Sequence, residues 1–338
     1  MIVWALTDNR VGDNNQTISL AEKLSKYYVI KQISYNFFIK LPNFIRRDTL
    51  IGIDKKRSSV LNDELPDVVV CSGRRLASVA LYIKKISRGR TFIINIKNPH
   101  LPYKKFDVLL FPNYDFTPKK VLQKYKNIIE VYGSLNEINK EKIDSEMEKF
   151  EPFIEYYKRP FVSFIVGGDT KNFKYDPKRF GVMVSNLANI INRTERSLFI
   201  TTSKRTSYEC TNQIRKKTNC NYYLYDWGWE CDPRNIIKSE LGNPYYAMLG
   251  FSDIFVVTGD SISILSEVCA TGKPVYVYMP KRTLSEKHYN FCLKLLKDGY
   301  IKKFNKNTQD FENYEYKPLK ELDRVVKIIF EKLRSKQN

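Results

Sequence analysis

Several features that would assign a protein to a class at once are missing from this sequence. No apolar run approaches the roughly 20 residues that a membrane-spanning helix needs. The opening residues, MIVWALTD, have neither the basic stretch nor the small-residue cleavage site of a signal peptide. We therefore expect a cytoplasmic protein that is not secreted and has no transmembrane segment.

Metal-binding side chains are also scarce. Only His100 and His288 are present, which excludes a histidine-rich metal centre. The cysteines form no Cys-x-x-Cys pair, and this spacing favours reduced thiols over a zinc site or a disulfide framework. The six are Cys71, Cys210, Cys220, Cys231, Cys269 and Cys292. The sequence therefore predicts no metal site.

Positive charge is present in excess. The 57 Lys and Arg residues against 37 Asp and Glu give a formal net charge of +20. Such an excess suits an anionic partner, whether nucleic acid, anionic lipid or a phosphorylated substrate. The cations are spread along the chain, however, and a solvated basic surface explains them equally well. No nucleic-acid recognition motif or stacking platform occurs, so no nucleic-acid partner is expected.

The length of 338 residues predicts two domains, each large enough for its own core. Apolar strands alternate with helical segments from 2–7 onward, and the alternation restarts at 161–166 after a charged connecting helix. This alternation is typical of parallel sheets with right-handed crossovers. We therefore predict an α/β fold of two Rossmann-like domains that face a central cleft. The predicted parts are residues 1–152, residues 153–318 and a helix, 319–338, that packs back across the domain joint.

The most informative segment runs from residue 243 to residue 280. A strand at 253–258 leads into the turn Gly259-Asp260-Ser261, which is followed by a helix and a second strand at 275–278. Such a unit places small polar side chains and backbone N–H groups at the carboxyl edge of a parallel sheet, where α/β folds bind phosphorylated ligands. Glu267, six residues past the turn, can point back to that edge. Simple helix capping explains the serines equally well.

Four other polar turns follow predicted strands, at 7–16, 71–75, 167–171 and 201–206. In the second, two guanidinium groups at a helix start oppose the helix dipole, so an anion explains them better than capping does. Paired glycines in the third allow close approach of a phosphate, although the Walker A spacing is absent. Each turn alone has an equally good local explanation. Because all lie on the same sheet edges, we expect them to form binding sites.

These turns resemble known families. The pattern D-S-x-S-x-x-x-E-…-G-K-P-V-x-V, which begins at Asp260, resembles the nucleotide-sugar half of GT-B glycosyltransferases. Over nearly the whole chain the sequence is similar to the mitochondrial-fission family founded by the plant "elongated mitochondria" protein, in its bacterial branch. The motifs that carry this similarity are Asp8…Gly12…Asn15-Gln16, Ser72-Gly73-Arg74, Asn98-Pro99, Phe106-Asp107, Gly167-Gly168, 201–206, Asn243-Pro244-Tyr245 and 258–275.

The resemblance implies a GT-B-like fold and a role for each turn. In the second domain, Glu267 would hold the ribose of a donor nucleotide. The predicted nucleotide- and diphosphate-binding residues are Gly167, Gly168, Ser203, Lys204, Arg205, Thr206, Asp260, Ser261, Ser263 and Glu267. The predicted acceptor- and anion-binding residues of the first domain are Arg10, Gly12, Asn15, Gln16, Ser72, Gly73 and Arg74. Asp8 and Asp13 are the candidate catalytic bases, and a turn-stabilising role suits Asp8 equally well.

Three classes of function remain open. The first is a GT-B-type glycosyltransferase that moves a sugar from a nucleotide sugar to a cell-envelope or lipid-linked acceptor. Helix N-termini and cations would neutralise the leaving diphosphate, so we expect neither a metal nor a separate cofactor. The second is a non-catalytic, membrane-associated adaptor, which the resemblance to the plant protein implies. The third, nucleic-acid binding, rests on charge alone.

The segment 35–47, YNFFIKLPNFIRR, bears on the partner. Its apolar side chains interleave with Lys40, Arg46 and Arg47, which suits the surface of an anionic membrane. Pro42 interrupts any continuous helix, and a loop tucked over the core of the first domain is the alternative. From the first interpretation we predict that Phe37–Arg47 binds peripherally to the inner face of a membrane.

Overall fold

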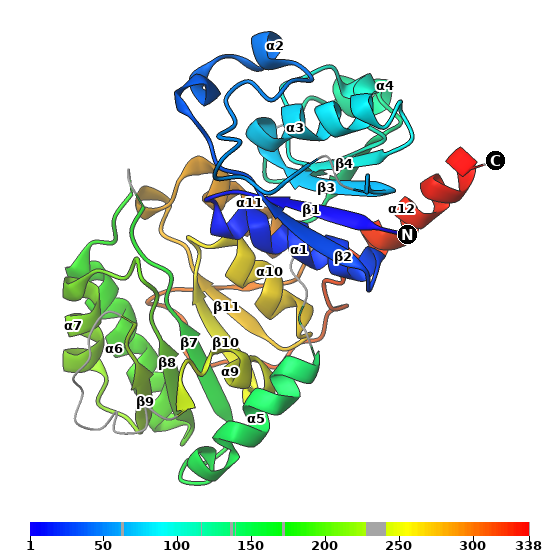
Figure 1. The fold of residues 1–338 in the computed structure, drawn as a ribbon. Coiled ribbons are helices and arrows are strands. Elements are labelled where there is room, and N and C mark those ends of the chain that lie inside the picture. The colour runs from blue at the N-terminus through cyan, green and yellow to red at the C-terminus, as the bar shows by residue number, and fades with distance from the viewer. Residues whose placement is uncertain are drawn as a thin grey trace. The chain divides into compact units, whose positions relative to one another are not determined.

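The computed structural model of the protein describes residues 1–61, 64–115, 117–135, 138, 140–170, 173–227 and 241–337. The chain forms two compact units, the first made of Met1–Glu137 with Lys320–Asn338 and the second of Ile138–Leu319. Each unit is a parallel sheet with helices packed on it (Figure 1). The predicted α/β fold with two Rossmann-like domains is confirmed.

The first unit contains a six-stranded sheet with the order β2-β1-β3-β4-β5-β6. Strands β1, β3, β4 and β5 are buried at every position, because both faces of the sheet are covered, and this explains their unbroken apolar sequences. The strands are β1 (Val3–Thr7), β2 (Tyr28–Gln32), β3 (Val68–Ser72), β4 (Phe92–Ile96), β5 (Val108–Pro112) and β6 (Ile128–Val131). The helices are α1 (Val11–Leu24), η1 (Phe37–Lys40), α2 (Asn43–Arg46), α3 (Gly73–Ile86), η2 (Tyr103–Lys105), α4 (Lys119–Lys124) and α12 (Glu321–Gln337).

The second unit repeats this plan with the strand order β12-β11-β10-β7-β8-β9, again all parallel. Its central strands β7, β8 and β10 are fully buried. The strands are β7 (Phe161–Ile165), β8 (Ser197–Thr201), β9 (Tyr222–Tyr225), β10 (Ile254–Thr258), β11 (Val275–Tyr278) and β12 (Lys302–Phe304). The helices are α5 (Lys140–Ile154), α6 (Pro177–Arg193), α7 (Tyr208–Lys217), α9 (Tyr245–Phe251), α10 (Ile262–Ala270), η4 (Lys281–Thr283) and α11 (Glu286–Lys297).

The boundary between the units differs from the predicted one at 152/153. Helix α5, predicted as a connector, packs against α9 and so belongs to the second unit. Gly250 in α9 permits this close packing, because a Cβ atom there would lie 2.1 Å from Sδ of Met147 in α5. The charged sequence of α5 indicated an exposed helix but carried no information about its packing partner.

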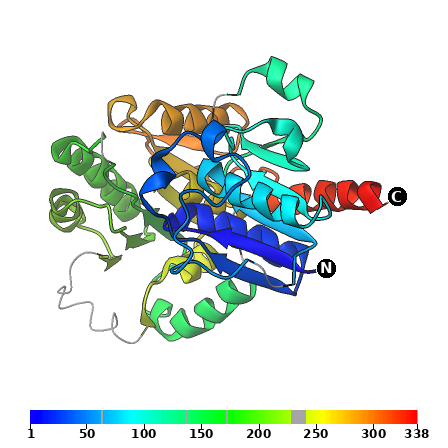
Figure 2. The same cartoon turned by 45° about the horizontal axis from the view of Figure 1, so that its top comes forward.

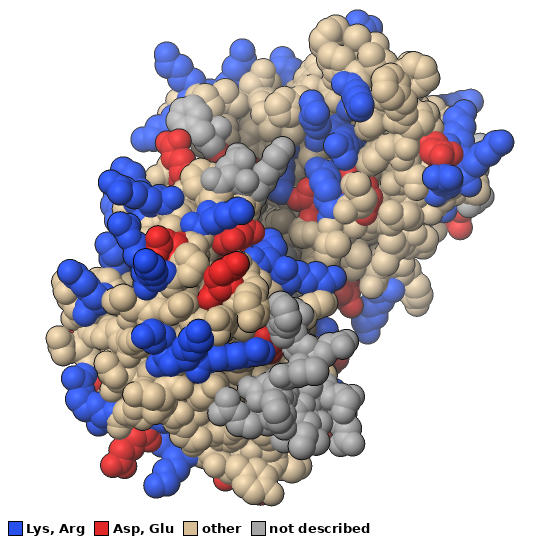
Figure 3. Space-filling model, turned by 90° about the vertical axis from the view of Figure 1, so that its left-hand side faces the viewer, with Lys and Arg blue, Asp and Glu red and all other residues tan. Residues whose placement is uncertain are grey.

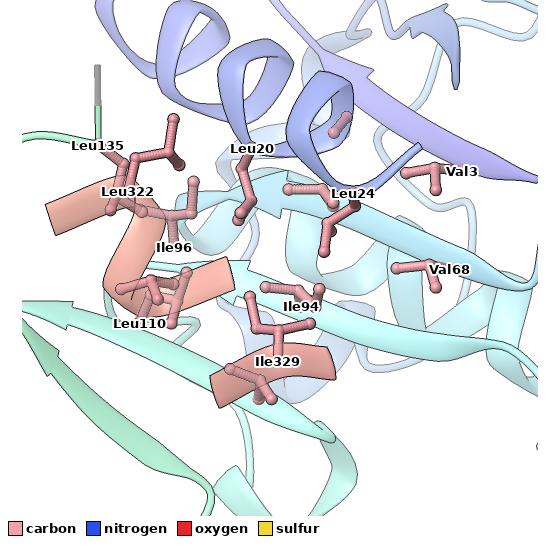
Figure 4. Packing of buried hydrophobic residues seen from close by; sticks show 14 of the residues in the cluster. Val3, Leu20, Leu24, Val68, Ile94, Ile96, Leu110, Leu135, Leu322 and Ile329 are labelled. Carbon is pink, nitrogen blue, oxygen red and sulfur yellow. The ribbon is translucent and has the colours of Figure 1, made fainter. Parts of the chain in front are cut away.

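The last helix is part of the first unit rather than a separate third part. Leu322 and Ile329 of α12 are buried in the same hydrophobic cluster as Leu20 and Leu24 of α1 (Figure 4). Residues of α3 belong to a second cluster, on the other face of the sheet (Figure 1 and Figure 2). The chain therefore returns to the first unit to complete its core.

The surface and the helix lengths bear on possible partners. On the face drawn in Figure 3, Lys and Arg side chains are scattered among neutral and acidic ones rather than gathered into one block. The charge pattern therefore agrees with the even spread of cations along the sequence.

Of the helices that the structure describes, none has both the length and the apolar composition needed to cross a bilayer.

Candidate functional site

In the second unit the strand order reverses between β7 and β10. The chain moves outward from β7 to β8 and β9 and then returns to the other side of β7 as β10. Such a switch point is where open α/β sheets bind ligands, beyond the carboxyl ends of the strands. Three predicted loops leave from this edge: 166–170 after β7, 202–206 after β8 and 259–261 after β10. The structure thus brings together the loops that we predicted to bind a diphosphate.

Asp260 holds these loops to one another. Its Oδ2 accepts hydrogen bonds from the Gly168 N–H and from Nη2 of Arg205, both at 2.8 Å. Its Oδ1 accepts one from the Tyr175 hydroxyl at 2.9 Å. Burial, and then the Asp260 carboxylate, raise the pKa of Tyr175 well above its usual range, which keeps the phenol a donor. These contacts favour a positioning role for Asp260 over the predicted contact with a diphosphate, because both of its oxygens already accept hydrogen bonds.

The two glycines after β7 are required by close approach. A Cβ atom on Gly167 would lie 2.1 Å from Oδ2 of Asp260, and one on Gly168 would lie 2.2 Å from the backbone carbon of Arg205. No side chain fits at either position. The glycines therefore pack the β7 turn tightly against the loops that follow β8 and β10.

Two predicted ligand hydroxyls also serve this packing. Ser203 and Thr206 both donate hydrogen bonds to the carbonyl of Gly167, Thr206 at 2.6 Å. The Thr206 hydroxyl also accepts one from the Ser203 N–H at 2.9 Å. These contacts fix the shape of the loop and support a positioning role for both side chains.

The cations of the loop after β8 lie at the surface. Lys204 is exposed, with its ammonium group 4.6 Å from the centre of the Trp227 ring. The Arg205 side chain is 40% exposed although it pairs with Asp260. Beyond that ion pair, Arg205 donates to the backbone carbonyls of Gly168 and Asp169 at 3.1 and 3.3 Å. The guanidinium group is thus held at the switch point with one edge toward solvent.

Helix α10 begins just after Asp260, the partner of Arg205. Ser261 is its N-cap, and the Ser261 hydroxyl accepts a hydrogen bond from the Ile264 N–H at 3.4 Å. The capping explanation therefore holds for Ser261. Ser263 lies in the first turn and is partly exposed. The first turn of a helix carries N–H groups without intrahelical partners and a positive end of the helix dipole, which together favour an anion.

Glu267 lies on α10 and has a partner that sequence reasoning missed. The hydroxyl of Tyr245, at the start of α9, donates a hydrogen bond to Oε2 of Glu267. Burial, and then the Glu267 carboxylate, raise the pKa of Tyr245 well above its usual range. Tyr245 stands in the Asn243-Pro244-Tyr245 motif, which was the available signal. Tyr175 had no comparable signal, since its partner Asp260 is 85 positions away.

The first unit has a switch point of the same kind, between β1 and β3. Asp8, directly after β1, is buried and accepts hydrogen bonds from Nε of Arg10 at 3.0 Å and from the Tyr35 hydroxyl at 2.7 Å. Arg10 reaches the carbonyl of Ser72 at the end of β3, at 3.1 Å. Burial alone would raise the pKa of Asp8, but the hydrogen bonds from Arg10 and Tyr35 outweigh it and hold this pKa below its ordinary value of 3.8. These contacts favour the turn-stabilising role of Asp8 over that of a base.

Asp13, the second candidate base, lies in the first turn of α1. Its side chain is 10% exposed, and one oxygen lies 2.9 Å from Nη1 of Arg10. The other oxygen pairs with Nζ of Lys97 at the end of β4, a residue that sequence reasoning missed. The ends of β1 and β4 thus contribute charged groups to one cluster, which consists of Asp8, Arg10, Asp13 and Lys97.

The remaining predicted residues of the first unit divide by exposure. Gly12, Asn15 and Arg74 are exposed, so a ligand can reach them. Ser72 and Gln16 are buried, and Gln16 accepts a hydrogen bond from the Leu135 N–H at 3.2 Å, which indicates a structural role. Gly73 has φ +73°, and a Cβ atom on it would lie 2.9 Å from Nη1 of Arg10, so this glycine makes room for the guanidinium group.

The lowered pKa of Asp8 has a measurable consequence. A carboxylate whose pKa is lower in the folded than in the unfolded chain stabilises the fold above the unfolded value of 3.8, and this contribution is lost as the pH falls through the folded-state pKa. We expect Asp8→Asn to flatten the loss of stability in acid, measured by urea denaturation between about pH 5 and 2. Asp323→Asn, at a side chain that is 63% exposed, should keep the wild-type slope. Equal slopes for wild type and Asp8→Asn would contradict the ion pairing of Asp8.

Among the described residues, no group of three or more His, Cys, Asp and Glu side chains is placed to hold a metal ion. Cys71, Cys210, Cys220, Cys269 and Cys292 are free thiols. Two residues that bear on the sequence predictions, Cys231 and Lys171 of the turn at 167–171, lie outside the described residues.

The fold and the paired switch points define a two-domain α/β protein of the GT-B-like class. The chain belongs to the mitochondrial fission ELM1 family, whose model matches residues 11–333. It is 30% identical to "Uncharacterized protein RP120" of Rickettsia prowazekii (strain Madrid E), over 97% of this chain and 98% of that one. It is 25% identical to the mitochondrial fission protein ELM1 of Arabidopsis thaliana, over 89% of this chain and 72% of that one.

Solved structures show the same fold. The UDP-GlcNAc 2-epimerase from Methanocaldococcus jannaschii is similar over 98% of this chain and 100% of that one, with a TM-score of 0.56 and 13% identity. The UDP-GlcNAc 2-epimerase from Neisseria meningitidis, bound to UDP-GlcNAc, is similar over 99% and 100%, with a TM-score of 0.54 and 14% identity. At these identities the likeness establishes the architecture and no further property.

Proposed function

We propose that this chain is a GT-B-type glycosyltransferase that binds a nucleotide sugar on its second unit and passes the sugar to a cell-envelope or lipid-linked acceptor. The observation that carries the proposal is the construction of the β7/β10 switch point. Glycines that admit no side chain, an exposed arginine and the start of α10 are tied together there by Asp260. Ligands of open α/β sheets bind at such points.

The diphosphate of the donor would lie against the start of α10, with Lys204 and Arg205 beside it. In the transfer step, the acceptor hydroxyl gives its proton to a carboxylate as its oxygen bonds to the anomeric carbon. The bond from that carbon to the diphosphate breaks, and the nucleoside diphosphate leaves with the electron pair. The cations and the helix N-terminus would stabilise the charge on the leaving group, so the step needs no metal.

Glu267 is the proposed ligand of the donor ribose, because its carboxylate can accept hydrogen bonds from ribose hydroxyls. The hydrogen bond from Tyr245 supports this role by orienting the carboxylate. Nucleotide-sugar binding is also supported by the fold that this chain shares with the Neisseria meningitidis epimerase, which is bound to UDP-GlcNAc.

A thermal-shift screen of nucleotides and nucleotide sugars tests the proposal first. A ligand that binds only the folded state raises the melting temperature by mass action, so one specific nucleotide sugar should stand out from the others. Uniform shifts with every polyphosphate would indicate charge attraction alone. No shift with any member of the set would contradict donor binding.

Substitution of Glu267 provides a sharper test of the site. Glu267→Ala should weaken binding of the nucleotide sugar by about 1–3 kcal/mol in calorimetry, the cost of leaving a polar ligand group unpaired. Glu267→Gln retains an acceptor for Tyr245 and separates loss of ligand contact from loss of local structure. Glu195→Ala is the matched control. Glu195 is exposed and lies just before β8, at the end of this strand that is far from the loop 202–206. Unchanged affinity in Glu267→Ala would remove this residue from the site.

The second candidate function is a non-catalytic, membrane-associated adaptor. Two observations favour it: the similarity to a plant mitochondrial fission protein and the ion pairing of both candidate bases in the first unit. A carboxylate held by cations is a weak proton acceptor. An adaptor of this kind would not turn over a nucleotide sugar, whether or not it still binds one.

A further inference from the structure

The segment 36–57, between β2 and β3, exposes apolar side chains to solvent. Phe37 is 74% exposed, Phe38 57%, Phe44 69% and Ile45 46%. The alternative prediction, a loop tucked over the core, is wrong for these four side chains. We call these four side chains, three phenylalanines and one isoleucine, the aromatic platform.

Helix α2 shows that this exposure is built into the fold. Its two polar side chains, Asn43 and Arg46, are buried, whereas Phe44 and Ile45 between them face solvent. Asn43 donates hydrogen bonds to two backbone carbonyls of neighbouring segments at 2.8 and 2.6 Å, and Arg46 donates to two more at 3.1 and 3.5 Å. Surface helices normally have the reverse polarity. Because the buried polar groups are satisfied, the helix keeps its apolar side outward.

A pocket of about 770 Å³ adjoins the platform. Phe38 belongs to both, so the exposed surface continues into the cavity. The volume lies within the roughly 300–1,000 Å³ of small-molecule sites. The apolar part of the wall comes from Phe38, Leu41, Leu50, Ile51, Ile53 and Tyr82.

The charges around the pocket indicate which partner fits. Residues 36–57 contain six Lys and Arg, of which Arg46 is buried, against two Asp. Lys55 and Lys85 line the pocket and are exposed, and Asp48 is the acidic residue of the lining. Lysine is depleted in protein–protein interfaces, whereas aromatic side chains beside Lys and Arg are typical of the boundary between a bilayer and water. The surface therefore suits an anionic lipid better than a protein.

We propose that the aromatic platform docks on an anionic bilayer and that the pocket takes one hydrocarbon chain of an anionic phospholipid, whose phosphate lies by Lys55 and Lys85. Apolar side chains would enter the bilayer boundary, and the cations would stay at the level of the head groups. This binding needs neither a nucleotide nor turnover. It can therefore fail or succeed independently of the proposed function.

Vesicle flotation tests the docking step. The full chain should bind vesicles of phosphatidylcholine with phosphatidylserine at low salt and bind far less to phosphatidylcholine alone. High salt should remove part of the binding, because exposed charges are screened within about 8–10 Å. The triple variant Phe37→Ser, Phe38→Ser, Phe44→Ser should lower the salt-resistant part at least tenfold, since three large apolar side chains no longer enter the bilayer. Tyr156→Ser, at a side chain of the second unit that is 84% exposed, should bind as wild type does.

A fluorescence measurement tests entry of the hydrocarbon chain. Phe38→Trp places a reporter in both the platform and the pocket wall, and phospholipids brominated in their chains should quench its emission, relative to the wild-type protein under the same conditions. Dihexanoyl phosphatidylglycerol below its micelle concentration should bind at one saturable site, and Ile51→Glu should remove that site. Flotation without quenching, or no saturable binding of the short-chain lipid, would overturn the pocket. Equal flotation of wild type and the triple variant would overturn the platform.

Discussion

Asp260→Ala is expected to lower the free energy of unfolding by roughly 2–5 kcal/mol, because it leaves two buried donors without an acceptor at about 1–3 kcal/mol each. These donors are the N–H of Gly168 and the hydroxyl of Tyr175. Arg205 also loses its carboxylate but is 40% exposed, so water compensates this loss in part. Urea denaturation measures the effect. Donor binding should be lost with it, since the β7 turn no longer has its anchor.

Two further variants make the result on Asp260 specific. Asp260→Asn keeps one carbonyl acceptor and the size of the side chain, so it should cost less than alanine. Asp310→Ala removes a carboxylate that pairs with Arg196 at 2.7 Å but is 51% exposed, and exposed pairs contribute about 0–1 kcal/mol. If Asp260→Ala and Asp310→Ala cost the same, Asp260 does not hold the switch point together.

The second large effect concerns catalysis. Asp13→Asn is expected to lower turnover about 10²–10⁴-fold, the usual contribution of a general base, while donor affinity stays unchanged. Both carboxylates are ion-paired, but Asp13 is the better candidate because its side chain is 10% exposed, whereas that of Asp8 is fully buried and has a lowered pKa. Asparagine matches the shape of aspartate but accepts no proton. Turnover and donor binding should be measured on the same preparation.

Asp8→Asn is the comparison for this prediction. We expect it to alter acid stability, while any loss of turnover should follow the loss of folded protein. If donor binds and both variants keep full turnover, the base is another residue. If no nucleotide sugar is turned over with lipid or lipopolysaccharide-core acceptors, the adaptor function is favoured.

The sequence alone was sufficient for the fold class and for the buried strands, but not for the boundary between the two units. Strands such as β3 and β10 are buried on both faces, and a strand in that environment must be apolar at every position, so its sequence identifies it. The turns after β1, β7, β8 and β10 were predictable for a related reason. Polar residues and glycines that directly follow a buried strand of a parallel sheet must lie at its carboxyl edge.

Only the tertiary structure decided what these polar residues do. The hydrogen-bond partners of Asp260 are Gly168, Tyr175 and Arg205, which lie between 55 and 92 positions away in the sequence. The strand order β10-β7-β8 brings them close to Asp260. Likewise, α2 faces its apolar side chains outward because Asn43 finds acceptors more than 30 positions away. Strand order and long-range hydrogen bonds depend on how whole elements pack, and the local pattern of one element does not contain that information. The tertiary structure was therefore needed to separate the residues that can contact a ligand from those that hold the loops in place.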